Sequence, residues 1–202
     1  MALRNCSLDG AIIKAAYNEF LEHGFTNASL HKIADKANVT TGAIYTRYKN
    51  KDALFVSLLE DFFEVMNACF EPAAAEYEKA RKSGSTEDFL NAIAFEESIY
   101  SKLILSHCDE CTLFFCKSDG SSVEKMLNQM MDNKAAQTVE FFRQTANRTV
   151  NANVIRLILA SQFRNLRQLL EMQLNKEDTL ACLREIYDFS EAGWKALFSK
   201  MK

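Results

Sequence analysis

Residues that make turns are scarce in this chain, and their scarcity limits the folds that it can adopt. Its 202 residues include only 6 glycines and 1 proline. A β-sandwich or β-barrel needs a turn about every 8–12 residues. Hydrophobic residues make up 48% of the chain and charged residues 25%, the balance of a folded protein with a buried core. The sequence therefore predicts an all-α protein with long helices and short loops.

Charge is distributed unevenly along the chain. The net charge is -3, but residues 1–51 carry seven basic and four acidic side chains and so have a net charge of +3. The remaining residues have a net charge of -6. A basic N-terminal part on an acidic body predicts that any polyanion binds near the N-terminus.

Signals for export or for membrane insertion are missing from the sequence. No apolar run approaches the roughly 18 residues of a transmembrane helix, and the opening MALRNCSLDG has no apolar core of a secretory signal. Six cysteines in such a chain are typical of thiols in a reducing compartment. We therefore expect a cytoplasmic protein with no membrane partner.

Two helical patterns open the chain. Apolar residues recur at helical spacing over residues 7–23, and Gly24 follows at the position of a left-handed cap. Ser29 is a good N-cap for a second, short helix. Asn38, which tolerates left-handed backbone, ends that helix. The pattern predicts two helices that pack through apolar stripes.

The turn that follows predicts a DNA-binding motif. Only residues 38–40 separate the second helix from a third, and Thr40 stands at the N-cap of the third. Val39 and Ile44 have the spacing of a hydrophobic staple, which fixes the angle at which the chain enters the helix. Two short helices joined in this way are typical of a helix-turn-helix, whose second helix enters the major groove of duplex DNA.

The third helix carries the side chains expected to contact DNA. Because Ile44 must face inward, the opposite face presents small and hydroxylated residues. Threonine offers a hydroxyl and a methyl to base edges, and a tyrosine hydroxyl suits a phosphate oxygen. Lys51 lies in the first turn of the next helix, where a phosphate would offset its unfavourable interaction with the helix dipole. The predicted DNA-binding residues are Ser29, Thr40, Thr41, Gly42, Ala43, Tyr45, Thr46, Arg47, Tyr48, Lys49 and Lys51.

Longer helices follow the motif. A fourth helix, capped by Asn50, is predicted over residues 51–70, with a break at Pro72. Capping-box spacings predict helices from Ser85 to about residue 107 and from Ser121 to about residue 145. Two further helices are predicted over 154–174 and 176–200.

Residues 7–58 are similar to a known family. The segment AAYNEFLEHGFTNASLHKIADKANVTTGAIYTRYKNKDALF resembles the N-terminal DNA-binding domain of TetR/AcrR-type transcriptional regulators. Tyr48 stands where phenylalanine is more usual in that family, and it preserves an aromatic core. The matching positions are Ala15, Ala16, Phe20, Gly24, Phe25, Ser29, Leu30, Ile33, Ala34, Ala37, Val39, Gly42, Ile44, Tyr45, Tyr48 and Lys51.

The resemblance implies both an architecture and a mode of action. It implies a helix-turn-helix DNA-binding domain over residues 1–50 and a helical effector-binding and dimerisation domain over residues 51–202. The expected protein is a ligand-responsive repressor that binds a palindromic operator as a homodimer. A small effector changes the spacing of the two DNA-binding heads and so releases the operator.

The last two predicted helices have apolar stripes suited to dimerisation. Gly193 interrupts the second stripe, and because glycine destabilises a helix, close approach by another helix is a reason for it. Packing within one subunit is the alternative explanation of both stripes. The predicted dimer-interface residues are Ile155, Leu159, Phe163, Leu166, Leu183, Tyr187 and Trp194.

Aromatic and methionine residues gather in the middle of the chain. Methionine adapts to irregular shapes and suits apolar pockets, although such residues at helical spacing also build ordinary cores. An apolar or aromatic effector is the class that this composition favours. The predicted ligand-binding residues are Phe62, Met66, Phe95, Tyr100, Phe114, Met126, Met130, Phe141 and Phe163.

One cluster hints at a different chemistry. His107, Cys108, Cys111 and Cys116 could serve a metal- or redox-responsive sensor, which is the alternative function. A single CxxC without a second pair lacks the four ligands of structural zinc, and buried thiols explain the cluster equally well. No nucleophile motif or phosphate-binding glycine loop is present. We therefore expect no enzyme activity, no catalytic or metal-binding residues and no cofactor.

Overall fold

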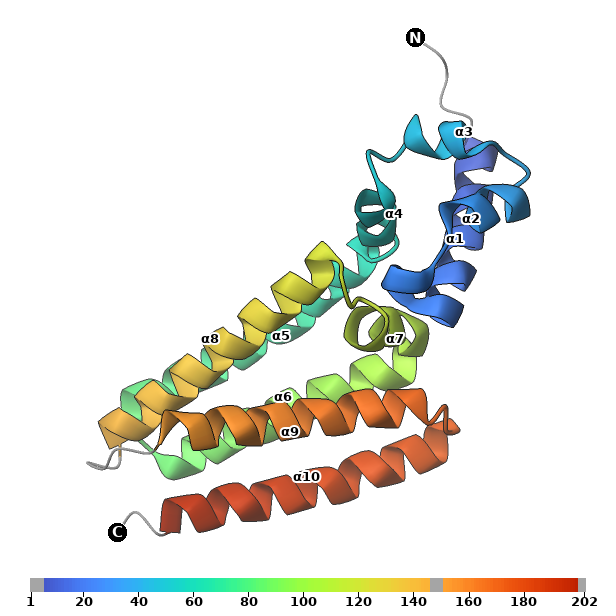
Figure 1. The fold of residues 1–202 in the computed structure, drawn as a ribbon. Helices are drawn as coiled ribbons and strands as arrows, with labels where there is room; N and C mark the ends of the chain where they lie inside the picture. The colour runs from blue at the N-terminus through green and yellow to red at the C-terminus, as the bar shows by residue number, and fades with distance from the viewer. Residues whose placement is uncertain (1–5, 146–150, 200–202) are drawn as a thin grey trace. The chain divides into compact units, whose positions relative to one another are not determined.

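The structure is a computed structural model that describes residues 6–145 and 151–199, with side chains from residues 9–144 and 151–199. Within these ranges every regular element is an α-helix, which confirms the predicted all-α class (Figure 1). The first five helices are α1 (Cys6–Asn27), α2 (Leu30–Lys36), α3 (Thr41–Tyr45), α4 (Lys51–Ser57) and α5 (Glu60–Ser83). The others are α6 (Thr86–Ser106), α7 (Cys108–Cys116), α8 (Ser122–Thr145), α9 (Ala152–Glu171) and α10 (Lys176–Ser199).

The chain divides into two compact units. Unit 1 comprises Met1–Phe63 and Asp109–Leu127, and unit 2 comprises Glu64–Cys108 and Asn128–Lys202. Helices α1 to α4 and nearly all of α7 belong to unit 1, whereas α6, α9 and α10 belong to unit 2. Helices α5 and α8 contribute residues to both.

Unit 1 is built around an aromatic cluster. Phe20 on α1 and Phe55 on α4 are fully buried, and their ring centroids lie 5.0 Å apart. The ring of Phe25 lies 5.4 Å from that of Phe55. Phe114 on α7 meets Phe62 on α5 at a ring distance of 6.1 Å. Edge-to-face and tilted packing at these distances stabilises the unit beyond simple burial, so a segment from the middle of the chain becomes part of its core.

The predicted ends of the first helices are confirmed. Gly24 has a φ of 71° and ends the regular part of α1, because a residue with a Cβ would be strained there. Asn38 has a φ of 53° and ends α2. The Asn50 side chain accepts a hydrogen bond from the amide of Ala53 and caps α4. These local signals fix where the motif's helices begin and end.

The prediction of one helix over residues 51–70 with a break at Pro72 is wrong. The helix ends at Ser57, α5 begins at Glu60, and Pro72 lies inside α5. Proline removes one backbone hydrogen bond and crowds the preceding turn. Met66 and Ala73, on either side of this point, are both buried. Tertiary packing of one continuous apolar stripe therefore outweighs the local cost of the proline.

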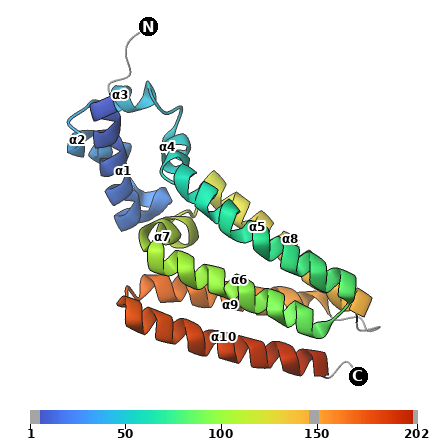
Figure 2. The ribbon, with the colours of Figure 1, turned by 180° about the vertical axis from the view of Figure 1, so that it is seen from behind.

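Unit 2 is a stack of helices with an aromatic core. Helices α6, α9 and α10 run side by side in both views (Figure 1 and Figure 2). The rings of Phe142 and Phe198 stack at 4.6 Å, and those of Phe89 and Phe141 stack at 4.2 Å. Trp194 is 3% exposed and belongs to the same core. None of the described helices is both long and apolar enough to cross a membrane.

Candidate nucleic-acid interface

Helix α3 is short, and its position is fixed at both ends. It has five residues, and the Thr40 side chain accepts a hydrogen bond of 3.2 Å from the amide of Ala43. The Val39 amide donates a 2.9 Å hydrogen bond to the carbonyl of Ala34, which holds the turn against α2. Ile44 is 1% exposed and anchors α3 in the core of unit 1. Cap, turn and anchor together determine which face of α3 meets solvent.

That outward face, which we call the recognition face, comprises Thr41, Gly42, Ala43, Tyr45 and Thr46. Tyr45 is the most prominent member, with 54% of its surface exposed. Gly42 and Thr46 are also exposed, whereas Thr41 and Ala43 are half-buried. The Thr46 hydroxyl donates a 2.9 Å hydrogen bond to the Gly42 carbonyl, so this hydroxyl serves the helix end. The face offers small side chains, threonine methyls and one long phenol.

Arg47 has an intramolecular role. Its Nε donates to a carboxylate oxygen of Asp9 on α1, and its guanidinium donates a 3.1 Å hydrogen bond to the Ala43 carbonyl. Only 15% of its side chain is exposed. The charge-assisted pair ties the C-terminal end of α3 to α1. Arg47 therefore orients the recognition face from behind.

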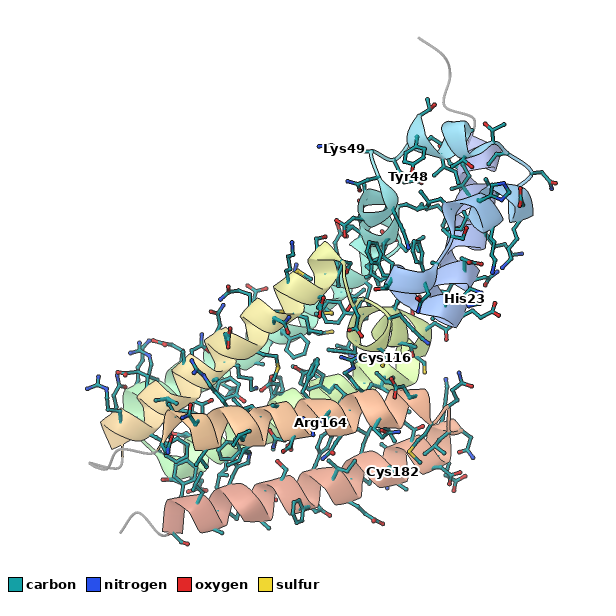
Figure 3. All side chains as sticks on the ribbon, in the orientation of Figure 1. His23, Tyr48, Lys49, Cys116, Arg164 and Cys182 are labelled. Atoms are coloured by element: carbon teal, nitrogen blue, oxygen red, sulfur yellow. The ribbon has the colours of Figure 1, made fainter. Side chains whose placement is uncertain are left out.

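The two lysines that follow lie in different environments. Lys51 Nζ donates a 3.2 Å hydrogen bond to the Thr26 carbonyl and lies 5.0 Å from the centre of the Phe25 ring. Burial lowers the pKa of Lys51, while the charge of Glu19 opposes this effect. Lys49 is exposed and extends away from the connection between α3 and α4 (Figure 3). Tyr48, which precedes both lysines in the sequence, is half-buried.

A buried carboxylate supports the helix-turn-helix from below. Glu19 is 0% exposed, and its oxygens accept hydrogen bonds from the Ser29 amide at 3.2 Å and from Lys36 Nζ at 3.0 Å. Burial raises the pKa of Glu19, but the bonds from Lys36 and Ser29 outweigh it, so the pKa lies below its usual value. The Ser29 side chain in turn caps α2 by accepting from the Lys32 amide. Ser29 and Glu19 thus join α1 to α2.

Sequence reasoning missed Glu19, although a signal was present. The residue occupies an inward position of the α1 stripe, next to Phe20. A lone acid on an apolar face indicates a buried ion pair. Its partner Lys36 is 17 residues away, and periodicity alone does not identify such a partner.

The loop between α7 and α8 also holds the end of α1. The Phe25 amide donates a 2.7 Å hydrogen bond to the Lys117 carbonyl, and the Thr26 hydroxyl donates a 2.6 Å bond to the Asp119 carbonyl. The Ser122 amide donates to Asp52 at the start of α4. These contacts join residues far apart in the chain, and no local pattern predicts them.

The residues predicted for the dimer interface pack within one subunit. Phe163 and Tyr187 line a cavity inside unit 2. The other five are at most 9% exposed: Ile155, Leu159, Leu166, Leu183 and Trp194. These seven side chains therefore pack mainly against residues of their own chain.

The outer faces of α9 and α10 carry a different apolar surface. Leu157 is 70% exposed and Phe189 is 83% exposed. Phe189, Gly193 and Leu197 line a groove between the two helices. A Cβ at Gly193 would meet none of the described atoms within 4 Å, so the helix surface there is open.

The predicted ligand-binding residues are dispersed. Only Tyr100 and Phe163 line the cavity of unit 2. Phe62, Phe114 and Met126 belong to unit 1. Met66 and Phe141 are buried, and the partly exposed residues are Phe95, Met126 and Met130.

The cavity of unit 2 has about 90 Å³ of open volume. Its apolar wall is largely aromatic and includes Tyr77, Phe89, Tyr100, Phe163, Tyr187 and Trp194. Its polar side chains are Glu96, Glu97, Lys134, Thr138, Gln162 and Ser190. Sequence reasoning missed these polar groups, although two adjacent acids within the apolar pattern of α6 were a usable signal.

The cysteines of the cluster differ in exposure. Cys111 and Cys116 are buried, whereas Cys108 is exposed. Among the described residues, no three histidine, cysteine, aspartate or glutamate side chains are placed to hold a metal ion. The arrangement of this cluster therefore gives no support to the alternative of a metal sensor.

Comparison with known proteins agrees with this geometry. A family model described as "Bacterial regulatory proteins, tetR family" matches residues 12–58, which contain the helix-turn-helix. Over these residues the chain is similar to the TetR family. The resemblance drawn from the sequence is thereby confirmed.

Two curated relatives match part of the chain. One is the "Probable acrEF/envCD operon repressor" of Escherichia coli (strain K12), 48% identical over 44 residues, which are 22% of this chain and 20% of that protein. The other is the "Fatty acid metabolism regulator protein" of Bacillus subtilis (strain 168), 35% identical over 72 residues, or 34% of this chain and 37% of that one. The chain thus matches between a fifth and two fifths of these relatives' length.

Solved structures resemble the chain over almost its whole length. A TetR-like regulator from Rhodococcus sp. RHA1 has a TM-score of 0.55 at 16% identity, covering 95% of this chain and 100% of that one. The regulator FadR from Bacillus subtilis, in complex with stearoyl-CoA, has a TM-score of 0.52 at 15% identity, covering 89% and 97%. At these identities the likeness shows the fold alone.

Proposed function

We propose that the chain is a homodimeric transcriptional repressor that binds a palindromic operator and is released by a small effector. The observation that carries this proposal is the recognition face on α3, which is turned outward by the buried Ile44 and the Thr40 cap. The identity to the Escherichia coli operon repressor is confined to a short segment and supports the same role. An operator is recognised by two such faces related by a two-fold axis.

Within this proposal the predicted DNA-binding residues divide into two groups. Thr41, Gly42 and Tyr45 lie on the outward face, where a helix in the major groove contacts bases and phosphates. Lys49 is exposed and supplies a phosphate contact. Arg47 acts through its bond to α1 and orients the helix.

Lys51 joins the phosphate contacts by a rearrangement of its side chain. Its ammonium is bonded to one carbonyl oxygen, that of Thr26, at 3.2 Å. An approaching phosphate is a stronger acceptor than a neutral carbonyl, so the lysine can exchange one for the other. The contact then positions the protein on any duplex without selecting a sequence.

In vitro selection from a random duplex library tests the proposal. The full chain is expected to enrich one inverted repeat whose half-sites are about one helical turn apart. Binding to that repeat should weaken steeply with salt and still exceed binding to random duplex by at least about 10³-fold. Enrichment of no sequence, or of a single half-site only, contradicts the proposal.

Substitutions on the recognition face sharpen this test. Tyr45→Ala is expected to weaken binding to all duplexes, and Thr41→Ala to change the preferred sequence, because the first side chain contacts the backbone and the second the bases. Thr46→Ala is expected to change the preference through its methyl group. Selection with Thr41→Ala that returns the wild-type repeat would show that the bases are contacted elsewhere.

The proposed dimer forms through the outer faces of α9 and α10. Leu157 and Phe189 are large apolar side chains at 70% and 83% exposure, and a cluster of this kind marks an association surface. Gly193 leaves open space in which a helix of a second copy can approach closely. A four-helix arrangement of two helices from each chain would bury this surface.

Sedimentation of charged variants tests the dimer. Leu157→Asp and Phe189→Asp are expected to convert the dimer into a monomer at micromolar concentration. Met172→Asp is the matched control, because Met172 is 53% exposed but lies beyond the last residue of α9. If the Leu157 and Phe189 variants stay dimeric, the interface lies on another surface.

A further inference from the structure

The cavity of unit 2 combines an aromatic wall with a polar end. Tyr100, Phe163 and Trp194 come from three different helices and line the same space. An open volume of about 90 Å³ accommodates several waters or a small organic molecule. An apolar pocket with a few convergent polar groups is the usual form of a small-molecule site.

At the polar end, one acid is already neutralised. Glu96 is 8% exposed and accepts a 2.5 Å hydrogen bond from the Tyr77 hydroxyl. Lys134 Nζ donates to the same carboxylate and lies 3.3 Å from the Tyr77 oxygen. Among the described residues, the only lysine that lines the cavity is therefore committed to Glu96.

The second acid, Glu97, is left with a surplus of negative neighbours. Besides burial, the charges of Glu96 and of Glu191 on α10 raise the pKa of Glu97. The charge of Lys134 on α8 and a hydrogen bond from Ser190 on α10 lower it. Gln162 on α9 donates a 2.5 Å hydrogen bond to the same serine oxygen. Arg184, Tyr187 and Asp188 on α10 line a surface groove together with Glu97.

A further polar group at this end is incompletely hydrogen-bonded. The hydroxyl of Tyr187 is buried and makes no hydrogen bond of ordinary geometry among the described residues, and Ser101 is the polar side chain that interacts with it. A buried unsatisfied hydroxyl is destabilising, and such groups in native proteins commonly mark a place where water or a ligand binds. The Tyr187 side chain also lines the cavity.

We propose that this cavity binds a small amphipathic amine, with its ammonium against Glu97 and the Tyr187 oxygen and its apolar body against the aromatic wall. A cation restores charge balance beside two acids and one lysine, and aromatic faces favour a cation further. A carboxylate or acyl phosphate would be repelled at the same place. This amine is the chemical class that we assign to the proposed effector. Its binding is independent of the proposed function, and only its effect on DNA binding rests on that function.

The protonation of Glu97 gives the site a pH signature. Burial raises the pKa of Glu97, and Glu96 and Glu191 add to this effect against Ser190 and Lys134, so that the pKa is about 7. The ammonium binds the ionised carboxylate, so amine binding displaces a proton below pH 7. Affinity for the amine is therefore expected to rise about tenfold from pH 6 to pH 8.

Fluorescence of Trp194, the one tryptophan in the chain, reports occupancy of the cavity in the full wild-type protein without DNA. The probes are 2-phenylethylamine, its neutral analogue 2-phenylethanol and the anion 3-phenylpropanoate. At pH 8 the amine is expected to bind at least tenfold more tightly than the alcohol, and the anion most weakly. Equal binding of amine and alcohol, tighter binding of the anion, or no binding of the amine overturns the proposal.

Glu97→Gln separates the role of the charge from that of the shape. The variant is expected to bind the alcohol as the wild type does, and to lose both the preference for the amine and its pH dependence. Glu177→Gln, on the exposed first turn of α10, is the matched control and should retain both. If Glu97→Gln keeps the amine preference, the ammonium lies elsewhere. The pH dependence of amine binding to the wild type tests the proposal even if the variant is unstable.

A separate measurement keeps the two proposals distinguishable. Release of the selected operator by 2-phenylethylamine is measured by fluorescence anisotropy. Amine binding with no specific duplex binding would overturn the proposed function and leave the ligand class standing. Specific duplex binding with no amine binding would overturn the ligand class and leave the proposed function standing.

Discussion

The amide of Phe25 donates a 2.7 Å hydrogen bond to the carbonyl oxygen of Lys117, which joins the end of α1 to the loop between α7 and α8. The Thr26 hydroxyl reinforces this junction by donating to Asp119. Both sides of the junction belong to unit 1. The end of α1 is therefore braced by a segment that lies 93 residues further along the chain. We expect the stability of the helix-turn-helix to depend on that segment.

Gly120→Ala is expected to destabilise this junction. Gly120 has a φ of 90°, and a Cβ there would lie 2.9 Å from the Thr26 Oγ1. Backbone strain of this kind costs about 1–3 kcal/mol. Gly10→Ala is the matched control, because a Cβ at Gly10 meets nothing within 4 Å on helix α1 and should stabilise the chain by about 0.5–1 kcal/mol. Urea unfolding measures both, and equal stabilities would contradict the role of the junction.

Glu19→Gln is expected to destabilise the chain in a pH-dependent manner. The pKa of Glu19 lies below its usual value of 4.5 through its bonds to Lys36 and Ser29, despite burial. Its ionised form therefore contributes stability above pH 4.5, and that contribution is lost as the pH falls through the folded-state pKa. Near pH 7 we expect the free energy of unfolding of the variant to be about 1–3 kcal/mol lower than that of the wild type. This difference should disappear at acidic pH. If thermal unfolding shows the same difference in stability between variant and wild type at every pH, the charge of Glu19 does not contribute to stability.

Glu97→Gln is expected to have the opposite pH dependence. The pKa of Glu97 is raised by burial from 4.5 to about 7, so the folded chain retains a proton that the unfolded chain has lost. Wild-type stability therefore declines, relative to the variant, as the pH rises from 4.5 to 7. The variant should melt higher than the wild type at pH 8 and at the same temperature at pH 4.5. A wild type that melts higher at pH 8 would contradict the raised pKa of this half-buried carboxyl.

Lys49→Ala is expected to reduce the salt dependence of DNA binding. One lost phosphate contact changes the slope of log affinity against log salt by about 0.9 for each subunit. The variant should bind specific and random duplexes more weakly by similar factors, because phosphate contacts do not select a sequence. Lys176→Ala, at the exposed start of α10, is the control and should leave the slope unchanged. An unchanged slope for Lys49→Ala would remove this residue from the contact set.

Local signals in the sequence were enough to define the helix-turn-helix. The caps at Ser29, Thr40 and Asn50, and the left-handed Asn38, act over three or four residues, so the sequence pattern contains them entirely. The inward position of Ile44 follows from the same periodicity. From these features both the motif and its outward face could be predicted.

Features that depend on distant partners could not be predicted. The sequence predicts Arg47 as a DNA contact, and no local pattern shows that its side chain also bonds to Asp9. Pro72 predicts a break that packing in α5 overrides. Ile155 and Leu157 are both apolar and lie on opposite sides of α9. Only the fold shows that Ile155 is buried and Leu157 is exposed. The pairing of Glu96 with Lys134, which leaves Glu97 unneutralised, likewise requires the fold.

The most direct test of the central claim is the amide chemical shifts of the full chain as the selected duplex is added. The largest changes are expected at Thr41, Gly42 and Tyr45, and they should extend to Lys49. Equal changes should occur in both subunits of the dimer. Specific binding of the duplex that leaves these amides unchanged, with shifts gathered on another surface, would contradict the account.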